Sequence, residues 1–199
     1  QEEQLNALTL VKTFLTGQSE AQIQKLHKRI TPYIQFRQTV DDFLCEFFNQ
    51  VCTQNCYQSH RSACCSKDGI ITFFADVLIN ALVSTSEQLT ALEQAIQNPE
   101  YKMKCIYLKS TGCLWQIKPS VCVMFLCENA QQRVFEESPH AKPTWQELKQ
   151  WERSFKWPDR PVLFDWLEQC AMDSGFHSPL MYLHTSPGLI RIKQLAGLI

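Results

Sequence analysis

The sequence has no excess of charge of either sign. Lys and Arg number 19 and Asp and Glu number 20 among 199 residues, so the net charge is −1. Such a balance creates no overall field that would attract a polyanion. We therefore expect no nucleic acid and no membrane among the partners of this protein.

Long apolar runs are also missing. The most apolar stretch, residues 70–83, is interrupted by Asp76 and Asn80. No run approaches the roughly 18 apolar residues that a membrane helix needs. The chain also opens without the basic and then apolar pattern of a secretory leader. These absences favour a reducing, cytoplasmic location.

The familiar signatures of catalysis are absent as well. The sequence contains no Gly-rich loop of the kind that cradles a nucleotide. Its Ser, His and Asp residues are scattered without a recognisable nucleophile context. Hydrolase chemistry is therefore the least favoured class, and no catalytic residue is identified.

Apolar residues spaced three or four apart predict helices along most of the chain. The first such stripe covers residues 5–15. Ser19 followed by Gln22 is a capping-box pattern, which predicts the start of a second helix that runs toward Pro32. A third helix is expected over about residues 38–54.

The pattern changes between residues 99 and 119, where a short extended segment and a turn are favoured over a helix. A helix is expected again over residues 119–135. Because the chain has no internal repeat, we predict a mainly α fold over a single domain, residues 1–199. This would be a helical bundle with an irregular or short hairpin segment around a cysteine-rich metal site. The metal-site core would cover about residues 45–127, with a C-terminal helical extension over about residues 140–199.

Ten cysteines are the most informative feature of the chain, because eight of them fall into two tight sets. Thiolates at short separations are typical ligands of zinc and of iron–sulfur clusters. We therefore predict that the cofactor is zinc or iron, with an iron–sulfur cluster as one form of the latter. The expected metal ligands are Cys52, Cys56, Cys64 and Cys65 in the first set, and Cys105, Cys113, Cys122 and Cys127 in the second.

Two other interpretations of the cysteines stay open. Structural disulfides are typical of small secreted domains that lack an adequate core, whereas this chain has 199 residues and is 45% apolar. Ordinary buried cysteines are the other alternative. The number of metal ions is also open. Eight thiolates suit two four-cysteine zinc sites, or one iron–sulfur cluster with the remaining cysteines structural.

Individual residues differ in what they are expected to contribute. The adjacent side chains of Cys64 and Cys65 point apart or crowd one another, so we expect them to serve different metals or to bridge within a polynuclear centre. His60 lies in a polar stretch and is expected to be solvated. Cys45 is an optional extra ligand, and Cys170 is expected to be a core position on an apolar helix.

The cysteines occur in a recognisable order of motifs. The pair Cys52 and Cys56 precedes Cys64–Cys65, and the second stretch reads Cys105-Ile-Tyr-Leu, Gly112-Cys113-Leu-Trp115 and Lys118-Pro119-Ser-Val-Cys122. Over residues 45–127 this order resembles the YkgJ-like family of zinc- or iron-chelating proteins, known for a CxxCxxxxCC signature. This chain differs in having three residues within the first pair and seven before the vicinal pair. Cys127 is an addition to the family pattern.

The resemblance implies a metal-chelating function, and some relatives of that family are linked to protein lysine methylation with an iron–sulfur centre. The absence of a Gly-rich nucleotide loop gives that activity no support here. We therefore predict a metal-binding protein whose centre is at least partly structural. The alternative is a metal-dependent redox or protein-modifying enzyme.

The C-terminal region is rich in tryptophan. Exposed indoles would suit a surface that binds a protein partner. Their helical spacing favours packing in the core instead. The residues concerned are Trp145, Trp151, Trp157 and Trp166.

Overall fold

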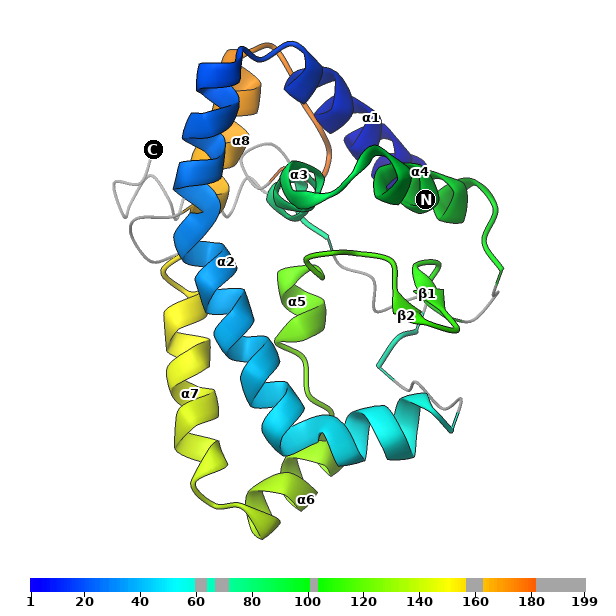
Figure 1. The fold of residues 1–199 in the computed structure, drawn as a ribbon, viewed down its shortest axis with the longest axis vertical. Helices are drawn as coiled ribbons and strands as arrows, with labels where there is room; N and C mark the ends of the chain where they lie inside the picture. Colours follow the sequence, from blue (N-terminus) through cyan, green and yellow to red (C-terminus); the bar gives the residue numbers. More distant parts are fainter. Residues whose placement is uncertain (60–63, 67–71, 101–103, 157–162, 182–199) are drawn as a thin grey trace.

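The computed structural model describes residues 1–59, 64–66, 72–100, 104–156 and 163–181. Within these ranges helices dominate and a single small hairpin is present (Figure 1). The prediction of a mainly α fold with a short hairpin is therefore confirmed. The elements in chain order are α1 (Glu2–Thr16), α2 (Glu20–Phe48), the π-helix η1 (Asn49–Tyr57), α3 (Phe74–Val83), α4 (Ser86–Gln97), β1 (Leu108–Lys109), β2 (Gly112–Cys113), α5 (Ser120–Val123), α6 (Glu128–Glu137), α7 (Ala141–Glu152) and α8 (Leu163–Asp173).

Helix α2 is the longest element, and it begins at the predicted capping box. The Ser19 N–H donates to Gln22 Oε1 at 2.8 Å, and the Gln22 N–H donates to Ser19 Oγ at 3.4 Å. The two helices predicted here, one running toward Pro32 and one over about residues 38–54, are joined in the structure, because α2 continues through Pro32 to Phe48. Proline removes one helical hydrogen bond. Burial of Tyr33 and Phe36 just beyond it keeps the same apolar face against the core and offsets that loss.

Helix α3 lies at the centre of the fold, where it packs against α1 and α8. Every residue from Phe74 to Ala81 is buried. A helix that is apolar nearly all round belongs inside a protein, and Asp76 and Asn80 are the exceptions that need polar partners there. None of the helices within the described ranges combines the length and apolar character needed to cross a membrane.

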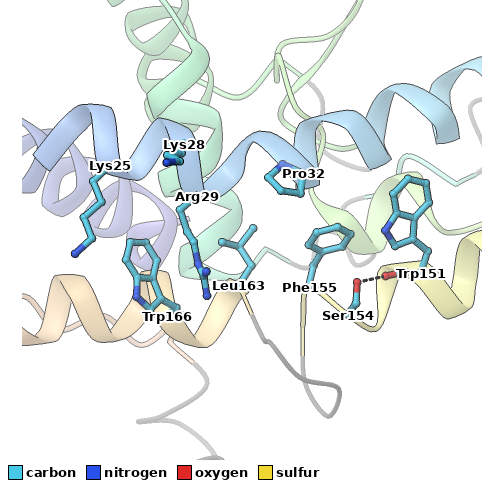
Figure 2. A pocket seen from close by; sticks show the side chains of 9 residues that line it. All are labelled: Lys25, Lys28, Arg29, Pro32, Trp151, Ser154, Phe155, Leu163 and Trp166. Atoms are coloured by element: carbon cyan, nitrogen blue, oxygen red, sulfur yellow. Dashed lines mark hydrogen bonds between the residues drawn. The ribbon is translucent and has the colours of Figure 1, made fainter. Parts of the chain in front are cut away.

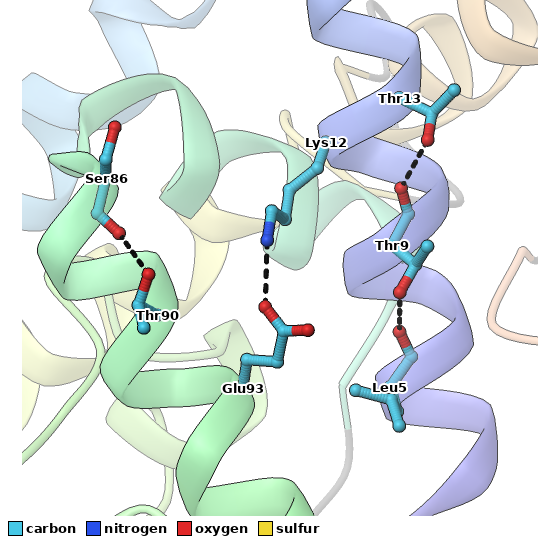
Figure 3. A network of polar contacts seen from close by, with 7 residues as sticks. All are labelled: Leu5, Thr9, Lys12, Thr13, Ser86, Thr90 and Glu93. Atoms are coloured by element: carbon cyan, nitrogen blue, oxygen red, sulfur yellow. Dashed lines mark hydrogen bonds and ion pairs between the residues drawn. The ribbon is translucent and has the colours of Figure 1, made fainter.

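Helices α1 and α4 are joined by an ion pair across their exposed sides (Figure 3). Lys12 Nζ lies 2.8 Å from Glu93 Oε2. In the same view, the hydroxyl groups of Thr9, Thr13 and Thr90 donate to carbonyls one helical turn earlier. A partly exposed pair of this kind contributes less than about 1 kcal/mol. The two helices are therefore held mainly by their buried apolar faces.

The region after Pro119 departs from the predicted single helix over 119–135. Two helices form instead, α5 and α6, and Cys127 stands between them as the N-cap of α6 with an extended backbone. Cys122 and Cys127 therefore do not lie on one continuous helix, because Cys122 is on α5 and Cys127 precedes α6.

The tryptophans of the C-terminal region divide between the core and the surface. Trp145 is buried and stacks on Phe43 with ring centroids 5.5 Å apart. Trp151 is 42% exposed, and Trp166 is partly buried. Core packing is therefore confirmed for Trp145 and wrong for Trp151, while Trp157 lies outside the described residues.

Candidate metal centre

The eight predicted ligands come from elements that lie far apart in the sequence. Cys52 and Cys56 are on η1, Cys105 and Cys113 flank or end the strands of the hairpin, and Cys122 is on α5. Figure 1 shows the hairpin and α5 between α3 and α4 on one side and η1 and α6 on the other. The fold therefore gathers the cysteine-bearing elements along one side of α2.

One group of thiols forms around the hairpin, and we call it the hairpin set: Cys65, Cys105, Cys113 and Cys122. The Cys105 N–H donates to the Cys65 carbonyl at 2.9 Å, and Ser66 pairs with Lys104 in an antiparallel bridge. The thiol of Cys65 has the other three as electrostatic neighbours. Burial, followed by the thiols of Cys105 and Cys113, raises the pKa of Cys122 to about 12.

The remaining four thiols gather at the junction of η1 and α6, and we call them the π-helix set: Cys52, Cys56, Cys64 and Cys127. Burial raises the pKa of Cys52 to about 11, and the nearby thiols of Cys64, Cys127 and Cys56 add to this effect. Helices η1 and α6 pack against each other. A π-helix of this length is rare, and such segments often occur at functional sites.

These spatial sets differ from the two sets of the sequence, because Cys65 and Cys127 exchange places. The vicinal pair is split, with Cys64 in one set and Cys65 in the other. The Cys64 thiol donates a hydrogen bond to the Cys65 sulfur, which raises the pKa of Cys64 and lowers that of Cys65. That the pair serves different metals or bridges within a polynuclear centre stays a prediction.

Backbone N–H groups point at two sulfurs of the hairpin set. The Tyr107 N–H donates to the Cys105 sulfur and the Trp115 N–H to the Cys113 sulfur, whereas the Leu108 N–H donates to the Cys105 carbonyl at 3.0 Å. Burial still raises the pKa of both thiols, because its effect exceeds that of the hydrogen bonds. Donors of this kind stabilise the negative charge of a thiolate. The N–H groups therefore offset only part of the effect of burial, and both thiols are harder to deprotonate than an exposed cysteine.

The hairpin turn depends on glycine at one position. Gly112 has a φ of 120°, and a Cβ there would meet no atom within 4 Å, so only its backbone conformation disfavours a side chain. Replacing Gly112 with alanine should lower the free energy of unfolding by about 1 to 3 kcal/mol. Urea denaturation measures this. Gly17→Ala is the control, because Gly17 has an ordinary φ of −80°, and an equal loss in both variants would contradict the explanation.

Three buried polar side chains hold the segment that leads into Cys122. Arg37 on α2 donates to the Lys118 carbonyl at 2.6 Å. On α3, Asp76 accepts from the Ser120 N–H at 3.0 Å and Asn80 accepts from the Ile117 N–H at 3.0 Å. These side chains are 1 to 3% exposed. They fix residues 117–120 against the core, and thereby the start of α5.

This support was not predicted from the sequence, in which Asp76 and Asn80 stand out only as interruptions of an apolar stretch. Their signal was the presence of two polar residues four apart in a segment otherwise apolar enough to be buried. No local pattern marks Arg37, because its partner lies 81 residues away.

The buried carboxyl group of Asp76 predicts a pH dependence. Burial raises the pKa of Asp76 to about 6, despite hydrogen bonds from the Phe73 and Ser120 N–H groups. A raised folded-state pKa means that the contribution of Asp76 to stability is fully present below about pH 4 and is lost as pH rises through about 6. The stability of the native protein relative to Asp76→Asn should therefore fall by about 2 to 3 kcal/mol from pH 4 to 7. Urea unfolding of both proteins across this range tests it, and a constant difference would contradict it.

The predicted ligands also differ in exposure and bonding. All ten cysteines are free thiols, so the disulfide interpretation finds no support. Cys64, Cys113, Cys122 and Cys127 are exposed, and the other four of the two sets are partly buried. In the described ranges, no three His, Cys, Asp or Glu side chains are arranged to hold one ion. The fold thus brings the thiols into two neighbourhoods, but within the described residues it does not place them at the mutual distances that ligands of one metal ion require.

The secondary candidates are Cys45, Cys170 and His60. Cys45 is exposed on α2. Cys170 is on α8, where its charged neighbours are Lys25, Asp173 and Arg29. His60 lies outside the described residues.

Comparison with known proteins found no protein family, curated protein or solved structure that matches this chain. The resemblance to the YkgJ-like family therefore stays a prediction based on the cysteine motifs.

Proposed function

We propose that this chain is a metal-binding protein in which clustered thiolates hold zinc or an iron–sulfur centre that stabilises the junction between helices. The observation that supports this most is the convergence of eight cysteines from separate elements as two groups of four. Four thiolates are the full complement for tetrahedral zinc and for common iron–sulfur clusters. Free thiols also suit a reducing compartment such as the cytoplasm.

Cations lie near three of the candidate ligands. Four thiolates around a divalent ion leave a net charge of about −2, which nearby cations can offset. The hydrogen bond to Cys65 raises the pKa of Cys64 and burial raises that of Cys113, and Lys104 and Lys118 respectively offset a small part of these shifts. Arg37 has the same effect on Cys122, which lies at the end of the segment that this arginine holds.

The metal centre would have a structural role because the hairpin is too small to be stable by itself. Its strands have two residues each, and an isolated hairpin of any length is marginal in water. Metal binding to thiolates supplies folding free energy directly, about 10 to 16 kcal/mol in zinc-finger peptides. A metal shared by Cys65, Cys105, Cys113 and Cys122 would tie together the hairpin, α5 and residues 64–66.

Metal analysis of protein purified without oxygen tests this proposal, together with the visible absorption spectrum. We expect at least about one equivalent of zinc or iron per chain. Colourless protein with stoichiometric zinc would remove most redox alternatives, whereas broad charge-transfer bands with iron and sulfide would identify an iron–sulfur centre. Less than about one equivalent of either metal, with the cysteines paired as disulfides, would contradict the proposal.

A further inference from the structure

A groove of about 700 Å³ lies between α2 and the adjoining parts of α7 and α8. Figure 2 shows Trp151 and Trp166 at its two ends, with Pro32, Phe155 and Leu163 between them. The lining residues include no cysteine within the described ranges. The groove is therefore a feature separate from the candidate metal centre.

Three cations of α2 surround one part of this groove. They are Lys25, Lys28 and Arg29, and all three side chains are exposed. The guanidinium of Arg29 lies 5.3 Å from the centre of the Trp166 ring. Among the residues that the structure describes, ion pairs with carboxylates are made by other cations: Lys12, Lys109, Arg133 and Lys156. The positive charge at the groove is therefore available to an external acidic group.

The composition of the groove resembles a protein interface more than a metabolite pocket. Aromatic residues and arginine are enriched at protein interfaces, whereas small-molecule sites rely on precisely placed polar groups. The neutral polar side chain here is Ser154, and its hydroxyl already donates to the Trp151 carbonyl at 2.8 Å (Figure 2). The cations extend from the rim on long side chains, where they select a partner by charge.

We propose that this groove binds a segment of a partner protein that carries carboxylates beside aromatic or aliphatic side chains. The apolar side chains of the segment would pack between Trp151 and Trp166, and its carboxylates would pair with Lys25, Lys28 and Arg29. The proposal does not depend on the metal centre.

The chain's own C-terminal residues are a poorer match in charge. Residues 182–199 include His184, Arg191 and Lys193 and contain no Asp or Glu. Like charges placed against each other disfavour binding. Charge complementarity therefore favours an acidic partner over this segment and over a second copy that would present it.

Fluorescence anisotropy with the full chain tests the proposal, using fluorescein-labelled peptides as probes. The peptide EELFEEL should bind, and binding should weaken as salt rises, because rim charges are screened. The basic peptide KKLFKKL and the polar peptide EESSEES should both bind at least about tenfold more weakly. The first lacks the carboxylates, and the second lacks the apolar side chains.

Variants of the protein localise the binding. Lys28→Glu should weaken binding of EELFEEL several-fold, and Trp151→Ala roughly tenfold. Lys142→Glu is the matched control, because Lys142 is exposed on α7 and does not line the groove; it should leave binding unchanged. Equal binding of the acidic and basic peptides, or equal effects of Lys28→Glu and Lys142→Glu, would overturn the proposal. So would a dimer of the native chain that dissociates on Trp151→Ala without peptide.

Discussion

Replacing Cys122 with serine should lower the metal content of the anaerobically purified protein to about half and reduce its stability. The substitution removes one soft ligand from the hairpin set. The π-helix set keeps all four of its ligands and should therefore keep its metal. Replacing Cys52 should have the same effect on the other half of the metal. Elemental analysis with thermal denaturation of each variant measures both quantities.

Cys170→Ser is the control for these substitutions. Its side chain is partly buried on α8, among groups that belong to neither set. We expect full metal content and only a small packing effect. Loss of all metal in both Cys122→Ser and Cys52→Ser would instead indicate one polynuclear centre bridged by Cys64 and Cys65. Loss of metal in Cys170→Ser, with full retention in Cys122→Ser and Cys64→Ser, would contradict the assignment of ligands.

Removal of the metal should destabilise the hairpin more than the helical core. The amides of Tyr107 and Trp115 donate to sulfurs of the hairpin set, and the Leu108 amide donates to the Cys105 carbonyl. Without metal, local opening of this region should raise their exchange rates on the order of 100-fold. Hydrogen exchange measured by NMR, with and without a chelator under reducing conditions, tests this.

The amides of α3 provide the internal control for this measurement. This helix is buried between α1 and α8, and its hydrogen bonds do not involve the cysteines. We expect its exchange to change much less than that of the hairpin. Equal acceleration in both regions would show that the metal stabilises the whole fold without a local role, and no change in either would show that it stabilises neither.

Local patterns were sufficient to predict most helices. The stripe over residues 5–15 became α1, and the Ser19–Gln22 pattern marks the start of α2. The prediction of separate helices before and after Pro32 was wrong, because burial on both sides of the proline outweighed its tendency to interrupt a helix. The structure of 119–135 was also mispredicted, since nothing in the apolar spacing shows that the chain turns at Cys127.

The candidate ligands could be named from the sequence, but their grouping could not. Sequence proximity placed Cys65 with Cys64, whereas the bridge between Ser66 and Lys104 brings it to the hairpin. Cys127 joins Cys52 because α6 packs on η1. Asp76 and Asn80 were missed for the same reason, because their backbone partners lie 44 and 37 residues away.

The most direct test of the central claim is X-ray absorption at the K-edge of the bound metal, recorded on the anaerobically purified full chain. We expect about four sulfur ligands per metal at about 2.3 Å, as for zinc bound by four cysteines, or iron–sulfur distances accompanied by iron–iron scattering. Replacing Cys122 should leave the spectrum of the remaining metal unchanged if the two sets bind separately. A first shell made mainly of nitrogen and oxygen would contradict the claim that these cysteines hold the metal.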